Sequence, residues 1–325
     1  MEYMFSLRIQ QSAIVVTLIL FVVTGCGRES NTGIQAHDEV VLSVSFSHDS
    51  RYLVTGSADG TARVFDALNS WEMVCELAGH GSWVYQSEFL PGDTQIVTAG
   101  FDGDLKLWSF MPCEELRTYE GHTDRVRAVS VHPSGRSFVS CGWDSTFISW
   151  DRERAEKLFR IRGHDEKICD LTLSPDGSVI ATASRDNLVS LWDKATGSRI
   201  ADLEGHTGDL KGVRYSPDGR HIASTGFDSM VIIWDAGALE ARHILRKHTD
   251  RLFAVAFSPD GATLASAGND ARIILWDTEE GKVQNILFPG SGVRKLSYSP
   301  DGRFLAAACA DGTVNVYALT LRGEN

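Results

Sequence analysis

Hydrophobic and polar positions along this chain form short runs of strand length. In residues 121–151, apolar or alternating runs occupy Val126–Val131, Ser137–Cys141 and Thr146–Trp150. Turn-forming residues separate the runs: Pro and Gly between the first two, Asp and Ser before the third. A fourth run, Lys157–Ile161, follows. We therefore expect four antiparallel strands, because no stretch of this pattern shows the 3.6-residue period of an amphipathic helix.

This four-run pattern repeats along the chain. Trp108 and Trp150 are 42 positions apart, and tryptophan returns at the same spacing at Trp192, Trp234 and Trp276, with Phe65 and Tyr317 at the corresponding places on either side. Histidine keeps the same spacing at His80, His122, His164, His206 and His248, preceded by His37. Seven copies fit between residues 34 and 317. A repeat of this length predicts a solenoid or propeller rather than several unrelated domains.

Each typical copy begins with Gly-His and ends with Trp-Asp, and this pattern resembles the WD40-repeat family. The resemblance implies an all-β fold, a seven-bladed propeller of four-stranded blades around a central channel. Only eight residues follow Tyr317, so the last copy lacks its own fourth strand. We expect Thr32–Ala36 to supply that strand and close the ring, which removes two exposed sheet edges. The propeller is expected over residues 34–319, followed by a tail at 320–325, as a monomer.

The N-terminal segment carries a different signal. Residues 13–23 form an uncharged apolar run of eleven, too short to span a bilayer comfortably but typical of a secretory signal peptide. The sequence Val23-Thr24-Gly25-Cys26 resembles the lipobox of bacterial lipoproteins. That resemblance implies a signal peptide at residues 1–25, palmitate or another acyl chain on Cys26, and a short tether over residues 26–33. It implies a membrane-anchored protein on the extracytoplasmic side of a bacterial cell envelope; an uncleaved anchor or a misassigned start codon is the alternative.

Composition narrows the chemistry. The chain has 325 residues, with 43 Asp and Glu against 31 Lys and Arg and a net charge of −12, which disfavours indiscriminate nucleic-acid binding. Six cysteines without a CxxC pair predict neither a disulfide framework nor a zinc ribbon. Cys141 and Cys309 fall in second strands and are expected to be buried. Cys169 lies on the predicted binding face, either as a reactive thiol or as a bystander.

Most copies carry His, Ser or Thr, and Asp at fixed spacing, the residue types of a hydrolase triad. The set recurs in copy after copy, which favours a structural role over an active site. The WD40 resemblance implies a buried hydrogen-bonded tetrad with the strand Trp, which would satisfy the buried indole N–H and hydroxyl. The tetrads expected are His80-Thr98-Asp102-Trp108, His122-Ser140-Asp144-Trp150, His164-Thr182-Asp186-Trp192, His206-Ser224-Asp228-Trp234 and His248-Ser266-Asp270-Trp276.

The two copies that meet at the ring closure depart from this set. The first, His37-Thr55-Asp59-Phe65, lacks the indole donor, and the seventh has Pro289, Ala307 and Tyr317 around Asp311. We therefore expect blades seven and one to be the least stable.

In the WD40 family, ligands usually meet the face formed by the loops after Gly-His and by the residue before the tetrad Asp. Carried over, these twenty-one positions hold seven Lys or Arg, six aromatic residues and one acidic residue, Asp209. Aromatic residues interleaved with Arg are typical of interface hot spots. The predicted partner-binding face comprises Trp83, Tyr85, Phe101, Arg125, Arg127, Trp143, Lys167, Arg185, Lys211, Phe227, Arg251, Phe253 and Arg294. Packing of these side chains against one another, with no ligand, is the alternative.

The sequence thus predicts a noncatalytic scaffold that binds another protein, through an acidic segment of that partner. No phosphate-binding Gly loop, HExxH or GxSxG occurs, and no cofactor or metal site is expected. A ligand- or glycan-binding sensor that uses the aromatic and basic channel mouth is the second hypothesis. An envelope hydrolase is the third.

Overall fold

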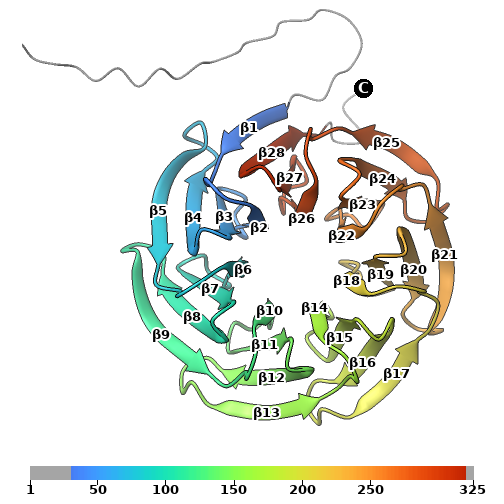
Figure 1. Ribbon diagram of the computed structural model, residues 1–325, viewed down its shortest axis with the longest axis horizontal. Coiled ribbons are helices and arrows are strands. Elements are labelled where there is room, and N and C mark those ends of the chain that lie inside the picture. Colours follow the sequence, from blue (N-terminus) through green and yellow to red (C-terminus); the bar gives the residue numbers. More distant parts are fainter. Residues whose placement is uncertain (1–30, 320–325) are drawn as a thin grey trace, which may run out of the picture.

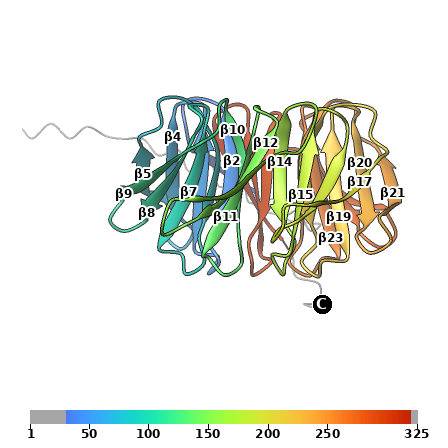
Figure 2. The same ribbon diagram turned by 90° about the horizontal axis from the view of Figure 1, so that it is seen from below.

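The computed structural model describes residues 31–319, which form 28 strands and no helix. The strands make seven four-stranded antiparallel sheets arranged around a central channel (Figure 1). Seen edge-on, the ring is a short cylinder with strands running between its two faces (Figure 2). No helix among these residues is long and apolar enough to cross a membrane. The predicted seven-bladed, all-β propeller is confirmed.

Blades one to four follow one another along the chain, each running from its innermost to its outermost strand. Blade one holds β2 (Val41–Phe46), β3 (Tyr52–Ser57), β4 (Thr61–Asp66) and β5 (Glu72–Ala78). Blade two holds β6 (Val84–Phe89), β7 (Gln95–Gly100), β8 (Asp104–Ser109) and β9 (Glu114–Glu120). Blade three holds β10 (Val126–Val131), β11 (Ser137–Gly142), β12 (Thr146–Asp151) and β13 (Lys157–Arg162). Blade four holds β14 (Ile168–Leu173), β15 (Val179–Ser184), β16 (Val189–Asp193) and β17 (Arg199–Leu203).

Blades five and six continue the order, and blade seven combines both ends of the described chain. Blade five holds β18 (Leu210–Tyr215), β19 (His221–Gly226), β20 (Met230–Asp235) and β21 (Glu240–Arg246). Blade six holds β22 (Leu252–Phe257), β23 (Thr263–Gly268), β24 (Ile273–Asp277) and β25 (Val283–Leu287). Blade seven holds β26 (Val293–Tyr298), β27 (Phe304–Cys309), β28 (Thr313–Ala318) and, outermost, β1 (Asn31–Gln35).

The predicted strands of blade three match β10 to β13, and three of the four extend one residue further. The turn between β10 and β11 shows why the sequence folds this way. Gly135 has φ of +67°, a conformation that side-chain-bearing residues adopt at a cost, and its N–H donates to the carbonyl of His132 at 2.7 Å. Turn chemistry and alternation therefore set the strand boundaries together.

Ring closure follows the prediction with a shift of one residue. Strand β1 pairs antiparallel with β28, from Asn31 opposite Tyr317 to Gln35 opposite Thr313. The predicted tether ended at residue 33, but backbone pairing with β28 already begins at Asn31, so residues 31–33 belong to the propeller. The rest of the predicted tether, the predicted acylation site Cys26, the predicted signal peptide and the tail at 320–325 lie outside the described residues.

The hydrophobic core is divided among the seven interfaces between neighbouring blades. Between blades three and four, Phe147 packs with Ile168 and Trp192, all of them buried. The closure interface is built the same way, with Ile34 beside Val41 and Phe65. Side chains of neighbouring sheets thus bury one another, and the ring axis is left as a channel.

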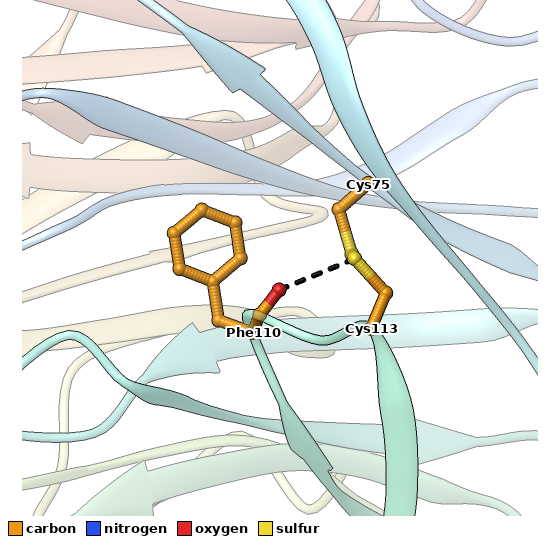
Figure 3. The surroundings of a disulfide bond; sticks show 3 residues. All are labelled: Cys75, Phe110 and Cys113. Atoms are coloured by element: carbon orange, nitrogen blue, oxygen red, sulfur yellow. Dashed lines mark hydrogen bonds between the residues drawn. A yellow bond between two sulfur atoms is a disulfide. The ribbon is translucent and has the colours of Figure 1, made fainter.

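A disulfide joins the outer parts of blades one and two. Cys75 lies in β5 and Cys113 at the turn before β9, with their Cα atoms 6.0 Å apart and Cys113 Sγ 3.2 Å from the carbonyl oxygen of Phe110 (Figure 3). Sequence analysis missed this bond because the two residues are 38 positions apart and only the packing of adjacent blades brings them together. Cys141, Cys169 and Cys309 are free and buried, as expected for Cys141 and Cys309.

Candidate functional site

The repeated His, Ser and Asp residues lie inside the blades and are fully engaged there. In blade three, His122 Nδ1 lies 3.0 Å from Asp144, His122 Nε2 lies 2.8 Å from Ser140 Oγ, and the Trp150 indole donates to Ser140 Oγ at 2.8 Å. An Nδ1–H donor to Asp144 leaves Nε2 to accept the Ser140 hydroxyl, which satisfies every group. Ser140 is fully buried. Its hydroxyl has no access to a substrate, so the set does not act as a hydrolase triad.

The same bonds recur in four more blades. They join His80-Thr98-Asp102-Trp108, His164-Thr182-Asp186-Trp192, His206-Ser224-Asp228-Trp234 and His248-Ser266-Asp270-Trp276. The pKa of Asp144 is lowered: burial opposes ionisation, but hydrogen bonding and charge from His122 outweigh it. Blade one keeps His37 with Asp59 at 2.8 Å and with Thr55 at 2.7 Å but has Phe65 in place of the indole.

The residues of the predicted partner-binding face meet at one end of the channel. One backbone hydrogen bond recurs in every blade. The N–H of the residue before the tetrad Asp position donates to a carbonyl in the loop that follows the His position, three residues past it. In blade three, this bond runs from Trp143 to Arg125 at 3.0 Å. The equivalent bonds run from Ala58 to Val40, Phe101 to Trp83, Arg185 to Lys167, Phe227 to Asp209, Asn269 to Arg251 and Ala310 to Gly292. This shared bond places side chains from two separate loops next to each other.

A second backbone feature directs the residue five positions past the His. In each innermost strand the pairing register shifts at this residue, for instance between Val126 and Ala128 in blade three. The shift is a β-bulge, which leaves one residue unpaired and reorients its side chain. The seven bulge residues are Leu42, Tyr85, Arg127, Cys169, Lys211, Phe253 and Arg294. They form the entrance of the channel.

Cations cover the faces of the aromatic rings here. The Arg127 guanidinium lies 3.9 Å from the centre of the Tyr85 ring, and Arg125 lies 3.6 Å from that of Phe101. Trp143 is contacted by Arg125, Lys167 and Arg185. Phe227 is contacted by Lys211 and Arg251, and Phe253 by Arg294. Such pairs hold long cationic side chains in place.

These side chains enclose a cavity of about 260 Å³, which we call the mouth. Ten of the thirteen predicted residues line it; Phe101, Lys167 and Arg251 do not but contact those that do. The full lining is Leu42, Trp83, Tyr85, Arg125, Arg127, Trp143, Cys169, Arg185, Lys211, Phe227, Phe253, Arg294 and Lys295. Six of these are Lys or Arg and none is Asp or Glu, so the mouth is strongly positive.

Two of the cations that line the mouth are partly removed from water, which disfavours their charged form. Burial is the first cause that lowers the pKa of Lys211 and of Arg294. Lys211 Nζ has Asp209 at 3.7 Å and Cys169 Sγ at 3.4 Å, and Arg294 donates to the neutral Asn269 at 2.8 Å. Cys169 is buried against Lys211, so it lines the mouth without being freely exposed.

Sequence analysis missed the floor of the mouth. Lys295 Nζ reaches across the channel from blade seven to both carboxylate oxygens of Asp170 in blade four, at 3.2 and 3.3 Å, and Arg214 of blade five donates to the same carboxylate at 2.8 Å. Burial lowers the pKa of Lys295 to about 8. At the position that Asp170 and Lys295 share, four other blades have Ser, Ala or Gly and blade two has Gln86, so the two charges stand out in an alignment of the repeats, although their contact does not.

Below this floor lies a second cavity of about 210 Å³, lined in part by the hydroxyl groups of Ser and Thr residues. Glu88 faces it, and burial raises the pKa of its carboxyl to about 7. Within residues 31–319, no group of three or more His, Cys, Asp or Glu is arranged to hold a metal ion.

Comparison with known proteins agrees with this geometry. The family model described as WD domain, G-beta repeat matches residues 28–66, 71–109 and 113–151. A model described as IFT122 first beta-propeller matches residues 167–325.

Similar curated proteins come from eukaryotes. DDB1- and CUL4-associated factor 10 of Xenopus tropicalis is 36% identical over 81 residues, which cover 25% of this chain and 18% of that protein. Polyadenylation factor subunit 2 of Cryptococcus neoformans is 31% identical over 93 residues, 29% of this chain and 13% of that protein. Jouberin of Mus musculus is 31% identical over 99 residues, 30% of this chain and 9% of that protein. The matched segments thus span less than a fifth of each relative.

Proposed function

Because the chain is a WD40-repeat protein folded as a seven-bladed β-propeller, we propose that it is a noncatalytic scaffold whose mouth binds an acidic segment of a partner protein. The observation that carries this proposal is the lining of the mouth, with six Lys or Arg and no carboxylate. Charge complementarity of this kind selects anionic partners and accelerates their association. Two similar proteins are named as an associated factor and a subunit, names that fit a role in assemblies.

The contacts of the aromatic rings favour a protein segment over a glycan. Sugars bind by stacking on open ring faces, but here guanidinium and ammonium groups cover Tyr85, Trp143 and Phe253. Among the aromatic residues that line the mouth, only Trp83 is substantially exposed, at 43%. The rings act as supports for the cations, so the ligand meets N–H donors. The glycan- or ligand-binding sensor therefore ranks second, and the envelope hydrolase ranks third because the Ser and Thr hydroxyls of the tetrads are buried.

The lipid anchor on Cys26 and an extracytoplasmic location in a bacterial envelope belong to the same proposal. The residues before Cys26 support it by their resemblance to a lipobox. The disulfide between Cys75 and Cys113 supports an oxidising compartment, where such bonds persist. Asn31 and the Gly312 turn lie at opposite ends of blade seven, and the Gly312 turn is at the end that faces the mouth. An anchored propeller would therefore present its mouth away from the membrane. Mass spectrometry of the purified native protein tests this directly: an unmodified residue at position 26 contradicts it.

A binding experiment tests the function. Wild-type protein is titrated into a fluorescein-labelled decamer of glutamate and, separately, into a neutral oligosaccharide. We expect the acidic peptide to bind, with an affinity that falls as salt rises. Arg185→Glu should weaken this binding at least tenfold, because it reverses a charge that lines the mouth.

Arg220→Glu is the matched control, because Arg220 is an exposed arginine whose exchange leaves the mouth intact. Binding of the oligosaccharide but not the peptide would favour the sensor instead.

A further inference from the structure

The cations in and around the mouth fall into two groups that differ in position. We define the inner ring as Arg127, Lys211 and Arg294, the bulge residues at the channel entrance, together with Lys295 beneath them. The outer ring is Arg125, Lys167, Arg185 and Arg251, which come from the surrounding loops.

Two outer-ring cations have a carboxylate nearby, and the other two lie outside the lining of the mouth. Arg185 Nε lies 3.5 Å from the Asp209 carboxylate, and Arg125 lies 4.0 Å from Asp124 while stacking on two rings. Lys167 and Arg251 rest on aromatic rings and do not line the mouth. A ligand gains less from a cation that already has a partner.

None of the inner-ring cations is fully exposed, and their positive charge is in excess: Lys211 has Asp209 at 3.7 Å and Lys295 has Asp170, but Arg127 and Arg294 form no ion pair among residues 31–319. Arg127 Nε is buried and, among residues 31–319, has no hydrogen-bond partner; Arg185 Nε of the outer ring has none either, but it lies 3.5 Å from the Asp209 carboxylate. Arg294 donates to a neutral amide, and Lys295 shares the single Asp170 carboxylate with Arg214. Buried cations without a full complement of anions are expensive, so an arriving carboxylate is worth most here.

The walls of the entrance define the shape of the anionic group. Leu42 is a bulge residue beside the cations and offers apolar surface, whereas the rings of the bulge residues Tyr85 and Phe253 support Arg127 and Arg294. An anion that reaches the inner ring must therefore carry its charge on an apolar stem. Two methylene groups of glutamate provide such a stem, and aspartate is one methylene shorter.

We propose that the inner ring receives one glutamate side chain of the partner, inserted end-on into the channel entrance with its carboxylate between Arg127, Lys211 and Arg294 above Lys295. This inference rests on the proposed function, which requires only that the mouth bind an acidic segment. It adds the residue type recognised and the residues that determine the specificity.

Protonation of Lys295 provides a second observable effect of this insertion. The charged groups facing it are Asp170, Arg214, Arg127 and Glu88. Burial leaves it partly unprotonated near pH 8, and an inserted carboxylate stabilises its ammonium form. Insertion is therefore accompanied by proton uptake near pH 8, and affinity falls as the pH rises above that value.

Two peptide titrations and a set of variants test the insertion. The labelled glutamate decamer should bind wild-type protein at least fivefold more tightly than the aspartate decamer. Lys211→Met or Arg294→Gln should weaken glutamate binding at least tenfold and reduce the preference over aspartate. Lys167→Met and Arg251→Gln are the matched outer-ring controls and should change affinity less than threefold. Lys211→Arg should restore binding if Lys211→Met fails to fold.

Calorimetry at pH 8 in buffers of different ionisation enthalpy measures the proton uptake, which Lys295→Met should abolish. Equal binding of the two peptides, or losses confined to the outer-ring variants, would overturn glutamate insertion and leave the acidic-segment function standing. If neither peptide binds wild-type protein, both proposals fail.

Discussion

Blade three and blade seven have the same four-stranded topology but different polar interiors. In blade three, a chain of hydrogen bonds runs from Asp144 to His122, then to Ser140 and to Trp150. Blade seven has no His or Trp at these positions; instead the Asn315 amide donates to the carbonyl of Pro289 at 3.1 Å. The same fold therefore forms without the tetrad, which shows that the tetrad contributes stability to a blade rather than its topology.

The largest expected effect comes from breaking the tetrad of blade three. Asp144→Asn removes the charge that His122 is oriented toward and should lower the free energy of unfolding by about 2–4 kcal/mol, because a buried network loses a partner. Urea denaturation measures it. In blade seven, Asp311 bonds only to the Thr313 N–H and hydroxyl in a turn, so Asp311→Asn should cost less than about 1 kcal/mol. Equal losses would remove the distinction between the two blades.

Native-state hydrogen exchange compares the intact blades. The strands of blade seven, together with β2 to β4 of blade one, should open with a free energy at least about 1 kcal/mol below that of blade three, since blade seven lacks the tetrad and blade one lacks its indole bond. Blade seven emerging as the most protected part of the ring would contradict this prediction.

Acid should narrow the difference between blade six and blade seven. Burial lowers the pKa of His248 in blade six below its ordinary value. The unfolded chain then takes up a proton near pH 6.5 that the folded blade resists, so stability is lost as the pH falls through that range. Between pH 7 and pH 5, we expect the opening free energy of blade six to fall by about 1 kcal/mol while blade seven, with Pro289 in place of His, stays constant. His248→Gln should make blade six equally insensitive.

The smallest expected effect is a repair of blade one. Phe65→Trp would supply the missing indole donor to Thr55, whose hydroxyl already meets His37 at 2.7 Å, and should raise stability by about 0.5–1 kcal/mol. Ala36 precedes His37 where blade two has Gly79, and a Cβ on Gly79 would lie 2.8 Å from the Trp108 ring. The Cβ of Ala36 would crowd a tryptophan at position 65 in the same way, so the double variant Phe65→Trp with Ala36→Gly tests whether removing that Cβ increases the gain. A gain in neither variant would mean that the indole bond adds nothing at the closure.

Most of the candidate site was predictable because the repeat makes it periodic. Once one copy is aligned with another, Arg127, Lys211 and Arg294 occupy one position, and the regular bulge carries them to one ring. The contact between Lys295 and Asp170 was not predicted because it forms between two blades that face each other across the channel. No local spacing encodes such a contact.

The sequence by itself determined the seven copies of the repeat and their strands, because these depend on strand period, turn residues and spacing, and its resemblance to WD40 repeats implied the ring, the closing strand and the five complete tetrads. Only the tertiary structure decided how the aromatic rings are used. Composition allowed them to be open stacking platforms, but packing places cations over them. The disulfide between Cys75 and Cys113 and the ion network on the channel axis were decided the same way. These contacts join different blades, so their geometry exists only after the ring has closed.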